Sequence, residues 1–164
     1  MKTTAELLAF LADIGVEQKT VHHPPLFTVA DSKALRGHID GAHTKNLFLK
    51  DKKDNFFLVS VDEDAVVDLK TIHVVIAAAG RVSFANADHL MRLLGVTPGA
   101  VTLFGAINDS AGHVRVFIDE ALMNAGTINA HPLTNEATTT VAADGMVRFL
   151  AATGHKPAIL KITG

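Results

Sequence analysis

The sequence predicts one α+β domain with a mixed β-sheet, and three observations lead to that prediction. Segments with the apolar spacing of helices and short β-prone segments follow one another without the regular strand–helix–strand rhythm of a parallel α/β fold. The 164 residues are 48% hydrophobic and 20% charged, which allows a real core and argues against disorder. No repeat, linker or low-complexity segment divides the chain. We therefore expect residues 1–164 to form a single domain.

The N-terminal part should contain two helices and a strand before the centre of the sheet. Capping threonines, terminating glycines and two consecutive prolines set the expected boundaries. The expected elements are a helix from Thr3 or Thr4 to Gly15, a strand over 16–22, and a short helix over 30–36 between Thr28 and Gly37.

The centre of the chain predicts a hairpin of two buried strands. Residues 47–49 and 56–61 are apolar runs, and 51–55 between them carry turn-forming side chains. Runs this apolar indicate a sheet that is covered on both faces. Lys45 and Asn46 then lie where polar residues give way to the buried strand. A lysine there must reach solvent, pair with an anion or line a cleft.

The remaining elements follow from local signals of the same kind. We expect helices over 68–78, 86–94 (with Gly95 as its stop) and 146–153, a turn over 96–99, an extended or irregular segment over 101–107, and strands over 81–85, 113–118, 127–130, 137–142 and 157–162.

Charge and composition exclude several classes of protein. The net charge of −2 does not indicate nucleic-acid binding, so any RNA contact would need a local patch. The basic residues of such a patch are Lys33, Arg36, Lys45, Lys50, Lys52 and Lys53, although a solvated turn explains Lys52 and Lys53 equally well. The absence of cysteine excludes disulfides and a cysteine nucleophile. Without a signal peptide or an apolar run long enough to span a membrane, we expect a cytoplasmic protein with no membrane partner.

The motifs of common hydrolases are missing. Nine histidines invite a metal site, but no H-E-x-x-H or deaminase-type pattern occurs, so we expect no metal and no cofactor. Only a site built from distant histidines stays open. The sequence also lacks a G-x-S-x-G elbow and a P-loop. A hydrolase of this kind must position water or use a group on its substrate.

Six stretches of the chain resemble the YbaK/prolyl-tRNA synthetase editing-domain family, in particular its free-standing trans-editing proteins of the ProX type, which deacylate alanyl-tRNA(Pro). The matching stretches are residues 23–29, 43–53, 93–99, 104–109, 131–135 and 149–155. This resemblance implies a strongly curved, barrel-like sheet surrounded by helices. It also implies a hydrolase that positions water at an aminoacyl ester.

The resemblance implies three catalytic residues: Lys45, Asn46 and His131. We assign Lys45 to the phosphate and ribose of the terminal adenosine through its charge, and Asn46 and His131 to water or ribose contacts. In a regular strand Lys45 and Asn46 face opposite sides, so a shared site needs a strand end or a bulge.

The resemblance also implies a substrate pocket. It is formed by Lys50 and the loop Gly99-Ala100-Val101-Thr102-Leu103. The family loop reads G-x-x-x-P, and Leu103 stands in place of its proline, which puts the shape of the pocket and the choice of amino acid in doubt.

Several functions compete at this point. The leading hypothesis is removal of alanine from mischarged tRNA(Pro), with tRNA and also prolyl-tRNA synthetase as partners. The same fold could instead edit serine or cysteine. A non-catalytic nucleic-acid-binding module is the alternative from another class, but the chain has no Tyr or Trp for base stacking. A metal-dependent small-molecule enzyme comes third.

Overall fold

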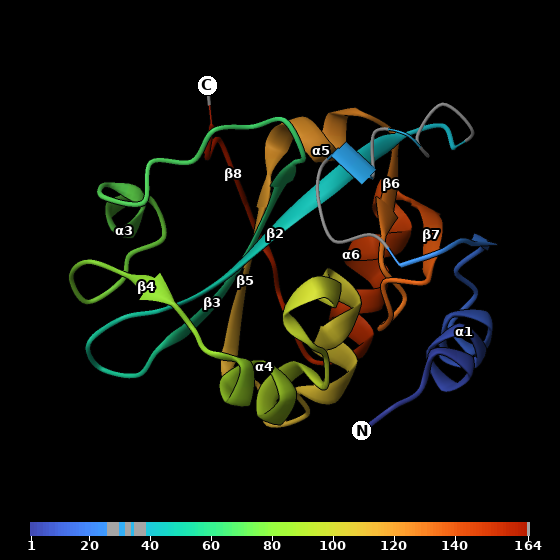
Figure 1. The fold of residues 1–164 in the computed structure, drawn as a ribbon, viewed down its shortest axis with the longest axis horizontal. Helices are drawn as coiled ribbons and strands as arrows, with labels where there is room; N and C mark the ends of the chain where they lie inside the picture. The colour runs from blue at the N-terminus through green and yellow to red at the C-terminus, as the bar shows by residue number, and fades with distance from the viewer. Residues whose placement is uncertain (26–29, 32–33, 35–38, 164) are drawn as a thin grey trace.

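The computed structural model describes residues 1–25, 30–31, 34 and 39–163. Eight strands form one mixed sheet in the order β1-β7-β6-β2-β3-β5-β8, with β4 paired to β2 (Figure 1). The strands are β1 (Gln18–His22), β2 (Ala42–Lys50), β3 (Phe56–Asp62), β4 (Ser83–Phe84), β5 (Val114–Asp119), β6 (Thr127–Ala130), β7 (Ala137–Ala142) and β8 (Ala158–Leu160). The helices are α1 (Thr4–Asp13), α3 (Ile72–Val75), α4 (Ala87–Leu94), α5 (Glu120–Asn124) and α6 (Ala143–Ala152), with 3₁₀ turns η1 (Pro98–Ala100) and η2 (Leu103–Asn108).

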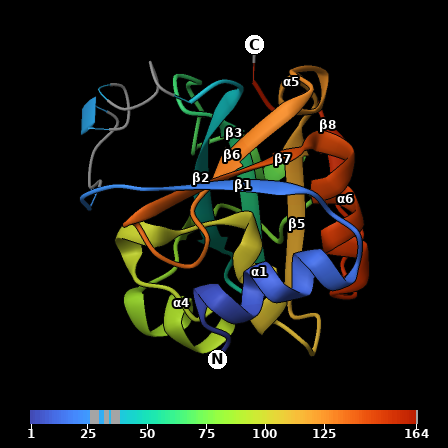
Figure 2. The same cartoon turned by 90° about the vertical axis from the view of Figure 1, so that its right-hand side faces the viewer.

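Strand β2 joins the two halves of this sheet. Its first residues pair with β6 in parallel, and residues 44–50 pair with β3 antiparallel. The parallel pairs β3–β5 and β5–β8 make the sheet mixed. Figure 2 shows β1 running across the direction of β5, so the sheet is strongly curved, while β1 and β8 remain its two edges. The predicted α+β fold with a curved, mixed sheet and surrounding helices is confirmed.

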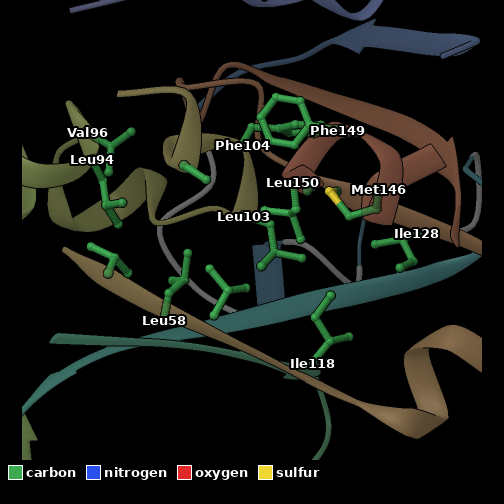
Figure 3. Packing of buried hydrophobic residues seen from close by; sticks show 14 of the residues in the cluster. Leu58, Leu94, Val96, Leu103, Phe104, Ile118, Ile128, Met146, Phe149 and Leu150 are labelled. Atoms are coloured by element: carbon green, nitrogen blue, oxygen red, sulfur yellow. The ribbon is translucent and has the colours of Figure 1, made fainter. Parts of the chain in front are cut away.

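Both faces of the sheet are buried, as the apolar runs predicted. Alternate residues of the hairpin enter two different clusters, because successive side chains of a strand point to opposite faces. Phe48 and Leu58 belong to the larger cluster, which also contains residues of α1, α4, η2 and α6. Figure 3 shows Leu58, Leu103 and Phe149 of this cluster. Leu49 and Phe57 belong to the smaller cluster, which includes residues of α3.

Predictions that rested on local capping signals are confirmed. Thr3 caps α1 in a capping box with Glu6. Asn86 caps α4, and Gly95 ends that helix with φ of 67°. Strands β6 and β7 have the predicted bounds.

Other boundaries were wrong. The helix expected over 68–78 is reduced to Ile72–Val75, because Asp68 binds the N–H of Lys70 in a turn and Ala77 takes a left-handed φ of 56°. The strand expected over 81–85 is only two residues long. The segment 101–107, expected to be extended or irregular, overlaps the 3₁₀ turn η2 (Leu103–Asn108), and helix α5 was not predicted.

Part of the N-terminal prediction cannot be compared with the structure. The helix expected over 30–36, with Thr28 and Gly37 at its ends, falls mostly outside the described residues. Residues 26–29 of the first matching stretch also lie outside them. In the described part of the chain, no helix has the length and apolar character that crossing a membrane requires.

Candidate active site

Lys45 and Asn46 lie inside β2, and this corrects the expectation that they mark its beginning. The strand starts at Ala42, and its pairing with β3 runs without interruption from Thr44 to Lys50. No bulge therefore turns the two side chains to one face, and they leave the strand on opposite sides. Asn46 is on the same face as Phe48, toward the larger cluster, and Lys45 is on the other.

Both residues border the edge of β2 that faces away from β3. On that edge β2 pairs with β6 at Ala42 and His43 and with β4 at Leu49 and Lys50. These partners lie toward opposite ends of β2 (Figure 1). On this edge, between β6 and β4, no described strand pairs with residues 45–47. We call this stretch the open edge of β2. A group bound at this edge can reach side chains from both faces of the strand.

Asn46 offers a free acceptor next to the predicted pocket loop. Its Nδ2 donates to the carbonyl oxygen of Val101 at 3.3 Å and lies 3.4 Å from Oγ1 of Thr44. Because a carbonyl can only accept, the amide nitrogen must face Val101. Oδ1 is then buried without a hydrogen-bond partner among the described residues. A buried acceptor of this kind is costly unless a water or a ligand supplies a donor.

The pocket loop reaches the site through its middle and its backbone. Gly99 and Ala100 belong to η1, and Val101 presents the carbonyl that Asn46 binds. Thr102 is buried and caps η2 by accepting from the N–H of Phe104. The side chain of Leu103 is fully buried in the larger cluster. Leu103 therefore supports the loop from the core.

The two predicted lysines make different contacts. Nζ of Lys45 donates to the carbonyl oxygen of Ala65 in the loop after β3, and the side chain is half-buried. Lys50 pairs with Asp54 across the hairpin turn at 3.0 Å. Four residues separate Lys50 from Asn46, or about 13 Å along a strand. Lys50 therefore lies at the hairpin end of β2, away from Asn46. Lys33 and Arg36 of the predicted basic patch lie outside the described residues.

His131 follows directly after β6, the parallel neighbour of β2. The ladder between β6 and β2 pairs Ala42 with Ile128 and His43 with Asn129 and ends there, two residues before His131. Nδ1 of His131 lies 3.2 Å from the carbonyl oxygen of Ala137. That oxygen can only accept, so Nδ1 carries the proton and Nε2 keeps a lone pair.

Burial also keeps His131 uncharged. The pKa of this imidazole lies below its ordinary value of 6.5, mainly because burial removes the ring from water. The hydrogen bond to Ala137 raises the pKa, and the nearby His23 lowers it, but neither effect outweighs burial. At neutral pH His131 thus presents an unprotonated Nε2 that can accept a proton.

Sequence reasoning missed Ser60. This residue pairs with Asn46 across β2 and β3, on the same face, and is fully buried. Its Oγ has no partner among the described residues, as is the case for Oδ1 of Asn46. The available signal was one hydroxyl in the otherwise apolar run 56–61. Two unpartnered polar atoms on neighbouring strands indicate a polar spot under the pocket loop.

These groups can support hydrolysis through a positioned water. Oδ1 of Asn46 can accept from a water, Nε2 of His131 can take its proton, and the ammonium of Lys45 can hold an anion. Among the described residues, no three His, Asp or Glu side chains are grouped so that they could hold a metal ion.

Comparisons with known proteins show which family the chain resembles. A family described as "Aminoacyl-tRNA editing domain" matches residues 23–149. The chain is 36% identical over 157 residues to "Prolyl-tRNA synthetase associated domain-containing protein 1" of Danio rerio, covering 94% of this chain and 85% of that protein. It is 30% identical over 156 residues to "Prolyl-tRNA editing protein ProX" of Acetoanaerobium sticklandii, covering 94% of each.

A solved structure has the same fold. The crystal structure of a "putative trans-editing enzyme for prolyl tRNA synthetase" superposes with a TM-score of 0.70 at 21% identity and covers 98% of both chains.

Proposed function

Because the chain belongs to the aminoacyl-tRNA editing domain family, we propose that it is a trans-editing hydrolase that removes alanine from mischarged tRNA(Pro). The observation that carries this proposal is the buried, unpartnered Oδ1 of Asn46 beside the pocket loop and the open edge of β2. A buried acceptor at that place is suited to hold a water against an ester carbonyl.

In the proposed mechanism the water donates one hydrogen bond to Oδ1 of Asn46, which leaves an oxygen lone pair free to attack the ester carbon. Nε2 of His131 takes a proton from the water as the new C–O bond forms, and returns it to the ribose oxygen as the ester C–O bond breaks. Lys45, on the other side of the open edge, offsets the charge of the terminal phosphate. Burial of the site strengthens this attraction relative to water.

The wider assignments follow from the same premise. Residues 1–164 act as one editing domain, tRNA is the substrate-bearing partner, and prolyl-tRNA synthetase is the enzyme whose errors are corrected. The reaction takes place in the cytoplasm, where charged tRNA is used. The loop backbone, which Leu103 supports from the core in place of the family proline, sets the size of the amino-acid pocket.

The test is release of labelled amino acid from a panel of aminoacyl-tRNAs that includes alanyl-, seryl- and cysteinyl-tRNA, with and without EDTA. We expect preferential release of alanine from tRNA(Pro), undiminished by the chelator. Preferential release of serine or cysteine would keep the hydrolase and reject alanine as its substrate. Binding of tRNA without release of any amino acid would favour the non-catalytic module. Activity lost in EDTA and restored by zinc would reject the positioned-water mechanism.

A further inference from the structure

A hollow lies at the turn end of the β2–β3 hairpin, away from Asn46. It has a volume of about 390 Å³ and is lined by residues of the turn, of α4 and of the segment before β5. The lining residues that matter here are Asp54, Asn55, Phe56, His89, Arg92 and His113. The resemblance and the proposed mechanism assign no role to this hollow.

Hydrogen-bond donors dominate its lining. His89 and Arg92 stand three residues apart on α4 and therefore share one face of that helix. Nδ1 of His89 accepts from the backbone N–H of Asn86 at 3.3 Å, so Nε2 must carry the ring proton as a donor. Among the described residues, no carboxylate or carbonyl accepts from the Arg92 guanidinium. Its contact is with the ring of Phe56, 6.0 Å from the centroid.

The one acidic side chain in the lining is already neutralised. Asp54 pairs with Lys50 at 3.0 Å on the solvent side of the turn. The exposed side chains of Lys52 and Lys53 add positive charge at the same turn. The hollow therefore presents a guanidinium and imidazoles to an incoming group, a set of donors that matches a phosphate.

Aromatic packing connects this hollow to β2. The His89 ring packs tilted against Phe56, with 5.1 Å between the centroids, and Arg92 contacts the same buried phenyl ring. Phe56 in turn stacks on Phe48 of β2, two residues from Asn46. Lys50 pairs with Phe56, and the distance along the strand from Asn46 to Lys50 is about 13 Å. A nucleic-acid strand covers that distance in roughly four stacked steps.

We propose that this hollow, centred on Arg92 and His89, binds a backbone phosphate of the tRNA acceptor stem, roughly four nucleotides from the aminoacylated end. This inference rests on the proposed function and adds a second point of attachment for its substrate. Arg92 positions the RNA and takes no part in the chemistry.

The test measures binding of an uncharged RNA hairpin that reproduces the acceptor stem and 3′ end, over a series of salt concentrations. Arg92→Gln should weaken binding roughly tenfold and reduce the slope of log Kd against log salt by about 0.7–0.9, the value of one phosphate contact. His113→Gln should weaken binding less. Both variants should keep the wild-type melting temperature, since both side chains are exposed.

Arg115→Gln is the matched control. Arg115 also covers a phenyl ring, that of Phe57 at 5.7 Å, but this ring belongs to the cluster on the opposite face of the sheet. The control removes the same charge and the same kind of contact, and should leave Kd within about twofold of the wild type.

Three results would overturn the proposal. These are unchanged binding by Arg92→Gln, equal losses for Arg92→Gln and Arg115→Gln, or tight binding of inorganic phosphate to the wild type in the same hollow without competition by the RNA. Because the RNA is uncharged, the result does not depend on catalysis. If Arg92→Gln weakens RNA binding as expected but the wild-type protein deacylates no aminoacyl-tRNA, the phosphate site is supported and the proposed function is refuted.

Discussion

At the scale of single residues, the proposed site uses two neighbours on β2, Lys45 and Asn46, whose side chains leave opposite faces of the strand. Asn46 supplies an acceptor beneath the pocket loop, and Lys45 supplies a charge on the other side of the open edge. The sequence predicted both residues through a family resemblance. It could not predict how they share a site, because the open edge results from the positions of β6 and β4, strands distant in the sequence.

The same limit explains why Ser60 was missed. Its interest comes from lying opposite Asn46 without a hydrogen-bond partner, and neither fact is encoded in nearby residues. Leu103 shows the converse case. The sequence identified it as a departure from the family loop, and only its burial shows that the side chain belongs to the core.

Lys45→Ala tests the charge at the open edge. We expect deacylation to fall about 100-fold or more, because an electrostatic contact to the reacting end of the substrate is lost. The melting temperature should change little, since Lys45 is half-buried and contributes one hydrogen bond, to Ala65. The measurement is kcat/KM beside thermal unfolding.

Lys52→Ala is the control for this prediction, since Lys52 is exposed at the hairpin turn. It should weaken tRNA binding modestly and leave kcat unchanged. If Lys45→Ala keeps near-normal turnover, or loses it only by melting, then Lys45 is a solvated lysine and its assignment to the site is wrong.

The lowered pKa of His131 predicts a pH dependence. The proposed proton acceptor is the neutral imidazole, so activity should hold through pH 6.5 and fall only at lower pH, as His131 becomes protonated. His131→Gln should remove that acid limb along with most of the activity. A decline already complete at pH 6.5 would contradict the assignment.

Stability should follow the same titration. The unfolded chain binds a proton to His131 more readily than the folded chain does, so the contribution of this residue to stability is lost as pH falls below 6.5. Measuring the unfolding free energy alongside kcat separates the two effects. A loss of kcat at a pH where the protein remains folded is the result expected for a catalytic group.

At the scale of elements, short-range signals were reliable and longer segments were not. The ends of α1 and α4 were predicted because a cap involves residues three or four apart. The helix over 68–78 was overestimated, because β-branched residues with apolar spacing also suit a short turn packed under a sheet. The 3₁₀ turn Leu103–Asn108 could not be recognised from the sequence, since its conformation depends on burial against the core.

Asp51 is expected to hold the hairpin turn and the segment before β4 together. Its carboxylate accepts from the N–H groups of Lys53, Asn55 and Ala79 and from the side chain of Asn55. Burial by itself would raise the pKa of Asp51, but these hydrogen bonds outweigh it and hold the pKa well below 3.8. Asp51→Ala should therefore lower the unfolding free energy by about 2–4 kcal/mol.

The pH dependence and a neighbouring aspartate provide the checks in urea titrations. Because the folded pKa is lowered, the stabilisation by Asp51 is complete above pH 3.8 and is lost as pH falls below it. The difference between wild type and variant should shrink in that range. Asp54→Ala, which removes an exposed carboxylate from the same turn, should cost less than about 1 kcal/mol. Equal losses for the two variants would contradict this role of Asp51.

Leu103→Pro tests whether the backbone conformation or the buried side chain of Leu103 matters more in the pocket loop. Leu103 is the first residue of η2, a position where proline is accepted, but its side chain is fully buried. We expect a loss of about 2–4 kcal/mol from missing packing, with deacylation retained by the folded protein. Leu103→Ala removes similar packing without fixing φ, and should cost a similar amount. A much larger loss for Leu103→Pro would show that the loop cannot take the family's proline.

At the scale of the whole molecule, the sequence predicted the class of fold but not the order of its strands. Composition and periodicity indicate covered strands and packed helices, which sufficed for an α+β domain with a curved sheet. The order depends on pairs such as β1 with β7, whose partners are more than a hundred residues apart. No local pattern specifies such pairs, since several covered strands could occupy the same neighbouring position.

This architecture predicts that the chain unfolds as one unit. The larger cluster takes residues from Leu7 in α1 to Leu150 in α6, and the smaller cluster shares β2, β3 and β5 with it on the other face of the sheet. Neither cluster can lose its strands without exposing the other, so one cooperative transition is expected in urea.

Two core variants test whether the chain unfolds in a single transition. Leu11→Ala removes packing from the larger cluster and Ile76→Ala from the smaller, and both side chains are almost completely buried. Each should cost about 2–5 kcal/mol. The chain has no Trp or Tyr, so the probes are far-UV circular dichroism and methyl NMR signals from each cluster. In a single unit, either variant moves the midpoint of every probe equally. If Ile76→Ala shifted only the signals of the smaller cluster, that face would unfold separately and residues 1–164 would not be one cooperative domain.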